Sequence, residues 1–315
     1  MRILHLLSLA AAGLLMISVA ACASAPAPAA PTMPPSLVPS PAVTRSASAE
    51  PTPDTTSDFE KAYEDFDPNN FDDSTNIDNG WFPLQPGMQY ILEGITEEAG
   101  LTTPHRVIFT VTDLTKMIDG IRTVVVWDQD FSAGAVEETE LAFFAQDNDG
   151  NVWHLGQYPE VYDKNGKLVE APAWISGLKG ARAGISMKAT PELGTPSYSQ
   201  GWGPAVNWTD RAQVAQMGQQ TCVPFDCFEN VLVIEEFSRD EPDAFQLKYY
   251  ARGVGNVRVG WRGADATKET LELIEFTRLS PEALAEVRAQ AMELEKRAYE
   301  ISKEVYDQTL PAESP

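Results

Sequence analysis

The side chains best placed to do chemistry in this sequence of 315 residues are carboxylates that stand next to one another. Glu235 and Glu236, or Glu137 and Glu138, would supply the two carboxyl groups that a glycosidase needs. Both pairs fall in segments that we expect to be strands, where adjacent residues point to opposite faces of the sheet. Neither pair can then share a site, and Glu235 remains a single catalytic candidate.

Histidine is the other source of acid–base chemistry. His105 and His154 follow the N-terminal region, and either could act as a base. No serine or cysteine motif accompanies them, and the patterns GxxxxGK[ST], HExxH, GxSxG and CxxC are absent from the sequence. We therefore expect no catalytic residues, with a carboxylate-dependent hydrolase as the alternative.

Calcium is the one metal that the sequence suggests. Oxygen-bearing side chains recur at alternate positions in Asp72, Ser74, Asn76 and Asp78. The loop is not an EF-hand, because Ile77 stands at the sixth position, where that motif requires glycine. We expect no other cofactor.

Aromatic side chains suggest a ligand surface. Trp202 and Trp208, with Tyr198 nearby, lie in a segment rich in glycine and proline, where exposed rings could stack on a sugar or another flat ligand. The alternative is that the rings anchor the loop to the core. A concave apolar surface inside a curled sheet, holding a lipid-like molecule, is the other binding hypothesis.

The cysteines fit an exported protein. Cys222 and Cys227 lie five positions apart, and an even pair in an oxidising compartment favours a small loop-closing disulfide. Two free buried thiols are the alternative. The two cysteines and the histidines do not have the spacing of a zinc site.

The charge balance limits the partners. The chain has 23 Lys and Arg against 46 Asp and Glu, a formal net charge of −23 and an isoelectric point near 4.4. Such a chain repels a phosphate backbone, so we expect no nucleic-acid partner. The remaining partners are a small molecule, a glycan or a protein.

The N-terminus has the pattern of an export signal. Arg2 precedes an apolar run over residues 3–20, which ends in Val19-Ala20-Ala21-Cys22. That tetrapeptide resembles the bacterial lipoprotein box, so residues 1–21 are predicted to be a signal peptide and Cys22 to carry lipid. An ordinary signal peptide is the alternative. A lipid on Cys22 would place the protein on the extracytoplasmic face of the cell membrane, without spanning it.

A tether is expected between the lipid and the folded body. Of the 35 residues from 23 to 57, 23 are Pro, Ala or Ser, and none is aromatic. Such a segment cannot bury enough apolar surface to offset its ordering entropy, so residues 22–57 are predicted to be disordered. The acidic body would repel anionic lipid, which limits membrane contact to the anchor.

The body, residues 58–279, is predicted to be mainly β. From about residue 80, apolar residues alternate with a period of two, and short turns separate the runs. Connections this short require antiparallel pairing. We expect ten to twelve strands in a meander that forms a curled sheet, an open barrel or a sandwich. A link is expected at 113–120, a strand at 206–217, and loops with one short strand (185–189) over 171–204.

One long C-terminal α-helix is predicted over residues 280–308. Ser280 and Pro281 form a cap and a first turn, and an apolar stripe follows at a 3–4 spacing. Glu293 and Arg297 are expected to pair on the outside. The stripe is predicted to pack on the β body, with a weak homodimeric coiled coil as the alternative.

A longer motif carries a resemblance. Residues 77–90 read IDNGWFPLQPGMQY, which resembles a family of uncharacterised bacterial secreted proteins and lipoproteins with an IDNxxFPLxPGxxY signature. Further matches at 145–153, 181–187 and 249–255 extend it over about residues 70–277. The resemblance implies a β-rich exported body of unassigned activity. The chain departs from the pattern over 200–210, and the C-terminal helix is an addition.

These features together predict a lipid-anchored, extracytoplasmic, β-rich binding or accessory module with no catalysis of its own. The alternative is a carboxylate-dependent hydrolase that acts on a cell-envelope or extracellular glycan.

Overall fold

The computed structural model describes residues 61–241 and 243–315. The predicted signal peptide, the lipidation site Cys22 and the predicted tether lie outside these residues. Among the helices of the described residues, none is long and apolar enough to cross a membrane.

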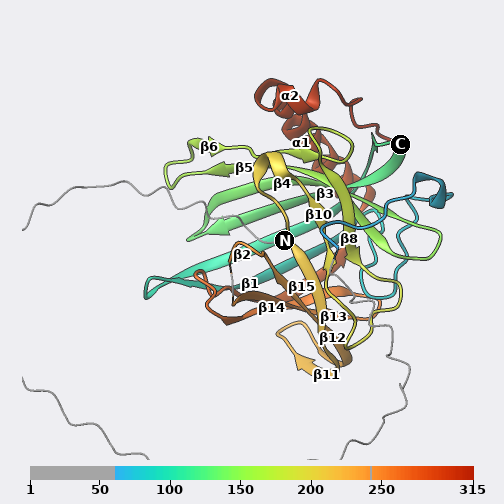
Figure 1. Ribbon diagram of the computed structural model, residues 1–315. Coiled ribbons are helices and arrows are strands. Elements are labelled where there is room, and N and C mark those ends of the chain that lie inside the picture. Colours follow the sequence, from blue (N-terminus) through green and yellow to red (C-terminus); the bar gives the residue numbers. More distant parts are fainter. Residues whose placement is uncertain (1–60, 242) are drawn as a thin grey trace, which may run out of the picture. The chain divides into compact units, whose positions relative to one another are not determined.

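The described body is one antiparallel sheet with helices at its C-terminal end, which confirms the predicted fold class (Figure 1). The strands are β1 (Met88–Glu98), β2 (Leu101–Ile118), β3 (Ile121–Ser132), β4 (Ala135–Gln146), β5 (Val152–Tyr162), β6 (Leu168–Glu170), β7 (Trp174–Ile175), β8 (Arg182–Met187), β9 (Tyr198–Ser199), β10 (Gly201–Trp202), β11 (Arg211–Cys222), β12 (Cys227–Phe237), β13 (Ala244–Ala251), β14 (Gly255–Gly263) and β15 (Thr270–Arg278). The helices are η1 (Pro68–Asn70), η2 (Pro204–Val206), α1 (Pro281–Ile301) and α2 (Lys303–Tyr306).

The chain itself joins the two edges of this sheet. The strand order is β10-β8-β5-β4-β3-β2-β1-β15-β14-β13-β12-β11-β9, and β6 and β7 pair with β5 off this path. The edge strands β9 and β10 are separated by Gln200 alone; β9 pairs with β11, and β10 pairs with β8. The sheet is therefore a nearly closed barrel.

Glycines allow the barrel to close at this seam. A Cβ on Gly201 would lie 2.4 Å from the ring of Trp208, and one on Gly184 would lie 2.2 Å from the backbone nitrogen of Gly201. The rings of Trp174 and Trp208 stack at 4.9 Å against this backbone. The segment rich in glycine and tryptophan thus joins the two edges of the sheet.

The signature residues pack on the concave face. The ring of Phe82 contacts Phe109 of β2, Phe144 of β4 and Tyr250 of β13, with centroids 5.8–6.1 Å apart. Strands β4 and β13 are far apart in the sheet order, so one residue can touch both only on the inner side of the curl. This contact identifies the face that bears Phe144 as the interior.

Helix α1 covers part of the outer face, as predicted. Ser280 caps it by accepting from the backbone N–H of Ala283, and the stripe residues Ala291, Leu294 and Ala298 are buried. Ile301, at the end of the stripe, is 40% exposed.

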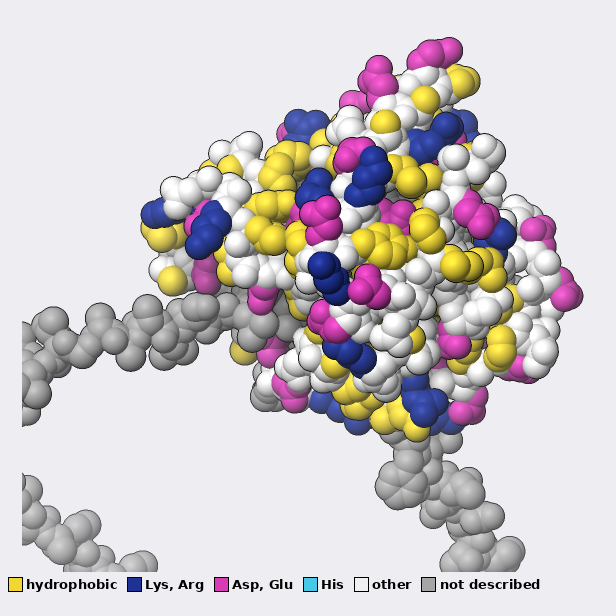
Figure 2. Space-filling model, turned by 90° about the horizontal axis from the view of Figure 1, so that it is seen from above, with side chains coloured by type: hydrophobic (Ala, Val, Ile, Leu, Met, Phe, Trp, Pro, Cys, Tyr) yellow, Lys and Arg dark blue, Asp and Glu magenta, His cyan; other side chains and the backbone are white. Residues whose placement is uncertain are grey.

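Seen from above, acidic and basic side chains are interspersed over the surface, so charge of one sign does not gather on this side (Figure 2).

A buried ion pair fixes α1 to β2. Lys116 Nζ lies 2.7 Å from Glu295 Oε1 and also donates to the backbone oxygen of Leu310. Glu295 in turn accepts from the backbone N–H of Ala312. Neither charged side chain is more than 3% exposed, so each depends on the other for its compensation.

Arg297 departs from its predicted pairing with Glu293. It forms a bidentate ion pair with Glu160 of β5, while Glu293 pairs with Lys296. The prediction was wrong because α1 turns Arg297 toward the sheet, where Glu160 is the nearer carboxylate.

Other predicted boundaries need correction. The expected link at 113–120 is strand up to Ile118, and the turn is confined to Asp119 and Gly120, both with positive φ. The region 171–204 holds β8 and three two-residue strands, and the strand expected at 206–217 is β11, Arg211–Cys222. These differences arise because pairing with a neighbouring strand extends or creates strands that local composition does not favour.

Replacing Lys116 tests the buried pair. Lys116→Met should lower the free energy of unfolding by about 3–5 kcal/mol, because it leaves Glu295 charged and buried. Adding Glu295→Gln, which keeps the acceptor for Ala312, should restore stability to within about 1 kcal/mol of the wild type. Urea unfolding of the three proteins is the measurement. A double variant no more stable than the single one would contradict this account.

Candidate functional site

Four carboxylates meet on the concave face of the β3–β4 hairpin. Asp128 stands opposite Glu140 in the register, and Asp130 stands opposite Glu138. All four lie on the same face as Phe144, because side chains alternate along β4 without interruption from Glu138 to Phe144. We refer to these four residues as the carboxylate cluster.

A histidine borders the carboxylate cluster. His105 of β2 is 3% exposed; its Nδ1 lies 3.3 Å from Asp130 Oδ1, and its Nε2 lies 2.8 Å from Glu269 Oε1. Gly94 of β1 stands opposite both His105 and Leu271, and a Cβ there would lie 1.9 Å from the backbone oxygen of Thr270. The missing side chain at Gly94 allows the backbone at Thr270, next to Glu269, to approach β1 closely.

Few positive charges balance the carboxylate cluster. Within residues 61–241 and 243–315, no ion pair joins the side chains of Asp128, Glu138 or Glu140 to a partner, and the buried Glu140 Oε1 accepts no hydrogen bond. Lys248 opposes the rise in the pKa of Asp128 and of Glu140, but it already pairs with Glu236 at 2.9 Å. The cluster therefore carries excess negative charge or must take up protons.

Proton uptake follows from the environment. Burial raises the pKa of Asp128 to about 6, that of Asp130 to about 7 and that of Glu138 to about 8, and it raises the pKa of Glu140 well above its usual value. Charges on neighbouring carboxylates add to each rise. Groups with such pKa values, gathered on one concave surface, mark a candidate functional site.

The pKa of His105 is raised, although burial by itself would lower it. Burial would lower its pKa, but the contacts with Asp130 and Glu269 outweigh that effect and raise the pKa to about 10. The positive charge of His105 therefore lies beside Asp130, one member of the cluster. His154 differs, because burial lowers its pKa to about 3 and leaves it neutral.

The aromatic residues predicted to bind a ligand lie at the seam. Tyr198 and Trp208 are buried, and Trp208 packs on His154 with centroids 5.3 Å apart. Trp202 is half-buried and contacts the ring of Tyr63 at 6.3 Å. The three side chains lie where the barrel closes, and ligand binding by them stays a prediction.

The predicted calcium residues already have protein partners. Asp72 accepts from the side chain of Asn148, and Asp78 accepts from that of Gln146. Ser74 donates to the backbone oxygen of Arg122. Calcium binding at Asp72, Ser74, Asn76 and Asp78 stays a prediction.

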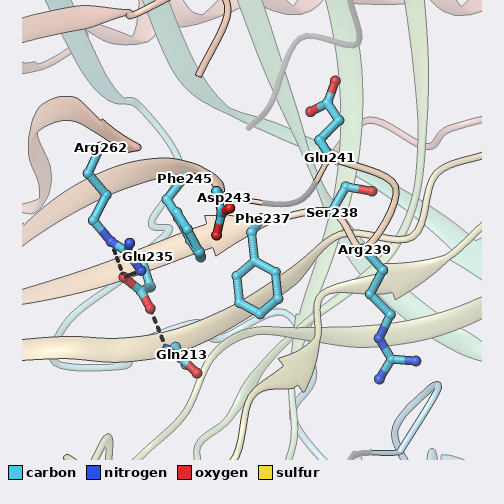
Figure 3. A pocket seen from close by; sticks show the side chains of 9 residues that line it. All are labelled: Gln213, Glu235, Phe237, Ser238, Arg239, Glu241, Asp243, Phe245 and Arg262. Atoms are coloured by element: carbon cyan, nitrogen blue, oxygen red, sulfur yellow. Dashed lines mark hydrogen bonds and ion pairs between the residues drawn. The ribbon is translucent and has the colours of Figure 1, made fainter. Parts of the chain in front are cut away.

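Glu235 and Glu236 point to opposite faces, as expected for adjacent strand residues. Glu236 lies on the concave face, where Lys248 and Gln200 contact it. Glu235 lies in an outer pocket of about 360 Å³, where its carboxylate pairs with Arg262 at 2.7 Å and accepts from Gln213 (Figure 3). Arg262 compensates the charge of Glu235, and a catalytic role for this carboxylate stays untested.

The predicted disulfide is confirmed. Cys222 and Cys227 are joined with an S–S distance of 2.08 Å. The two cysteines are the last residue of β11 and the first of β12, and they face each other in the register. The bridge therefore closes the turn of this hairpin.

Comparison with known proteins gives two structural similarities. No protein-family model and no curated protein matches the chain. A "putative exported protein with YmcC-like fold" from Bacteroides fragilis NCTC 9343 has 12% identity and a TM-score of 0.37, over 63% of this chain and 99% of its own. A "putative lipoprotein" from Parabacteroides distasonis ATCC 8503 has 12% identity and a TM-score of 0.29, over 62% of this chain and 97% of its own.

Most of the carboxylate cluster escaped the sequence analysis, although a signal was present. Asp128 and Asp130 precede the turn around Gly134 at the same distances at which Glu140 and Glu138 follow it. Acids two apart on both arms of a hairpin must share one face. Pairing adjacent acids, such as Glu137 with Glu138, overlooked this spacing.

The stability of the ligand-free protein should fall as the pH rises from 5 to 8. Asp130 and Glu138 keep protons in the folded state that the unfolded chain has already lost, so raising the pH favours unfolding. The raised pKa of His105 acts in the same direction. The expected slope is up to about 1.4 kcal/mol per pH unit for each proton released.

Calorimetry at constant ionic strength with a chelator measures this dependence. Combining Asp130→Asn with Glu138→Gln should flatten it. Glu272→Gln, on the opposite face of β15, should leave it unchanged. Stability that rises toward pH 8 in the wild-type protein would contradict the proposed protonation.

Proposed function

We propose that this chain is a lipid-anchored, extracytoplasmic binding module that holds a positively charged ligand on the concave face of its barrel, with no catalysis of its own. The observation that carries the proposal is the carboxylate cluster, Asp128, Asp130, Glu138 and Glu140, on one inner surface. Glu269 adds a fifth carboxylate beside it through His105.

Stability alone does not account for such a cluster. Burying one unpaired carboxylate costs several kcal/mol, or forces its protonation, and four of them face one another here. Apolar residues at these strand positions would form an ordinary barrel core. A ligand that supplies positive charge would compensate the carboxylates in the folded protein.

The four carboxylates of the cluster differ in burial. Asp128 and Glu138 are half-buried, while Asp130 and Glu140 are buried. Glu138 lies close to the β3–β4 turn, where Ala133 and Gly134 are exposed. A ligand entering past this turn would meet Glu138 first and Glu140 last.

The extracytoplasmic location is supported by the sequence. The apolar N-terminal run ends in Val19-Ala20-Ala21-Cys22, and a Pro/Ala/Ser-rich segment separates it from the body. The disulfide between Cys222 and Cys227 fits an oxidising compartment. Lipidation of Cys22 would keep the module at the membrane surface, at the end of its tether.

A carboxylate-dependent hydrolase is the second candidate. Asp130 and Glu269 each offer a carboxylate oxygen within 4.8 Å of the other, bridged by His105. Glycosidases place two carboxyl groups with different pKa values on either side of a sugar bond. Release of reducing sugar from a cell-envelope glycan by the wild type, and not by Asp130→Asn, would favour this candidate.

Organic cations should stabilise the full-length protein in detergent. At 100 times its dissociation constant, a bound cation adds about 2.7 kcal/mol, or a rise in Tm of roughly 5–10 °C. Putrescine, spermidine and choline are the cationic probes, and neutral sugars and citrate are the comparisons. Thermal unfolding is the measurement.

Two sets of variants test whether the rise in Tm depends on the carboxylate cluster. Asp128→Asn combined with Glu140→Gln should abolish the cation-induced rise in Tm. Glu235→Gln, on the outer face, should retain it. Rises of equal size with neutral sugars, or no rise with any organic or metal cation, would rule out a cation-binding module.

The anchor has its own test. The wild-type protein expressed in bacteria should partition into the detergent phase and incorporate labelled palmitate. Cys22→Ser should remain in the aqueous phase and carry no label, because lipid is attached to the cysteine that follows the signal peptide. Detergent partitioning of Cys22→Ser would show that another segment holds the membrane.

A further inference from the structure

We propose that the ligand held at the concave face is a divalent first-row transition-metal ion, bound by His105, Asp130 and Glu269 beside the carboxylate cluster. This inference rests on the proposed function and names the class of cation. It does not involve the calcium loop predicted from the sequence.

The three side chains converge from different strands. His105 comes from β2, Asp130 from β3, and Glu269 immediately precedes β15. Each offers one ligand atom, and these three atoms lie within 4.8 Å of one another. Two ligands of one ion with bonds of 2.0–2.2 Å can be at most about 4.4 Å apart, so a small contraction brings all three into range.

The contacts of His105 bring two carboxylates to its ring, and a metal ion would take one of the two ring nitrogens. Nε2 is 2.8 Å from Glu269 and Nδ1 is 3.3 Å from Asp130, yet neither ring nitrogen makes an aligned hydrogen bond. Asp130 Oδ1 also has no hydrogen-bond partner. Close nitrogen and oxygen atoms that are not aligned as donor and acceptor are what neighbouring ligands of one metal ion present.

A second, independent observation lies next to this group. Glu140 is 1% exposed, stands on the same concave face, and its Oε1 has no partner within the described part of the chain. Buried carboxylate oxygens without partners are rare unless a cation or a proton completes them. A divalent ion bound at Asp130 would add positive charge on the face that Asp128, Glu138 and Glu140 share with it.

The donor types select the metal class. Imidazole nitrogen favours Zn²⁺, Fe²⁺ and Ni²⁺, while carboxylate oxygen also accepts Mn²⁺. Ca²⁺ and Mg²⁺ prefer ligand sets made of oxygen alone. A site of one imidazole and several carboxylates therefore points to Zn²⁺ or Mn²⁺ rather than Ca²⁺.

The register places Gly94 opposite His105, which supports a preformed site. Any side chain at Gly94 would collide with the backbone of Thr270, the residue after Glu269. The outer face of the same strand differs. There Glu272, two residues from Thr270, pairs with Arg258. That contrast supplies a matched control.

The test uses the full-length protein in detergent, stripped with chelator and titrated separately with Zn²⁺, Mn²⁺, Ca²⁺ and Mg²⁺ by calorimetry. We expect one Zn²⁺ or Mn²⁺ per chain, with Ca²⁺ and Mg²⁺ at least 10-fold weaker. Asp130→Asn and Glu269→Gln should each reduce the affinity for Zn²⁺ by 10-fold or more, since each removes a charged ligand. Glu272→Gln should change it less than 2-fold.

A measurement on the wild type guards against variants that fail to fold. Substoichiometric Mn²⁺ should broaden the ring signals of His105 in an NMR spectrum, while those of His154 persist longer. Affinity that survives Asp130→Asn and Glu269→Gln, selective loss of the His154 signals, or Ca²⁺ binding as tightly as Zn²⁺ would overturn the proposal.

The outcomes separate this inference from the proposed function. If spermidine or another organic cation raises Tm and no metal ion binds, the module binds cations but the metal proposal fails. If neither class binds, both fail. If Zn²⁺ binds with the expected dependence on Asp130 and Glu269, both stand.

Discussion

The closure of the sheet at Gln200 is the constraint on which the rest of this structure depends. One residue separates a strand that pairs with β11 from a strand that pairs with β8, so the two edges meet within a single short segment. Glycines 184 and 201 permit that approach, because a side chain at either would collide with a ring or the backbone. Once the edges meet, one face of every long strand is turned inward.

Because the sheet closes, the alternation of side chains along each strand separates an interior face from an exterior face. On an open sheet both faces would reach solvent, and a carboxylate on either face would stay hydrated. Here Glu235 faces outward to Arg262, while its neighbour Glu236 faces inward to Lys248. The same alternation places the carboxylate cluster on the interior face. Helix α1 covers part of the exterior face, where Lys116 pairs with Glu295.

The two buried charged groups show opposite ways of meeting the cost of desolvation. Lys116 and Glu295 compensate each other and receive further hydrogen bonds from the chain around residues 310–312. In the carboxylate cluster only Asp130 has a cationic neighbour, His105, and within the described residues Asp128, Glu138 and Glu140 form no ion pair, so protons or a cation must compensate them. The first arrangement stabilises the fold, and under the proposed function the second would make the interior respond to pH and to a bound cation.

The sequence by itself determined the local features: the period-two strands, the cap at Ser280, and the pairing of Cys222 with Cys227. Each depends on residues close together in the chain, and local geometry suffices to predict it. The tertiary structure alone decided that His105 meets Asp130 and Glu269, residues more than 160 positions apart at the extremes. It also turned Arg297 toward Glu160 rather than Glu293. Such contacts depend on strand order, register and the direction of curl, which are set by packing across the whole sheet.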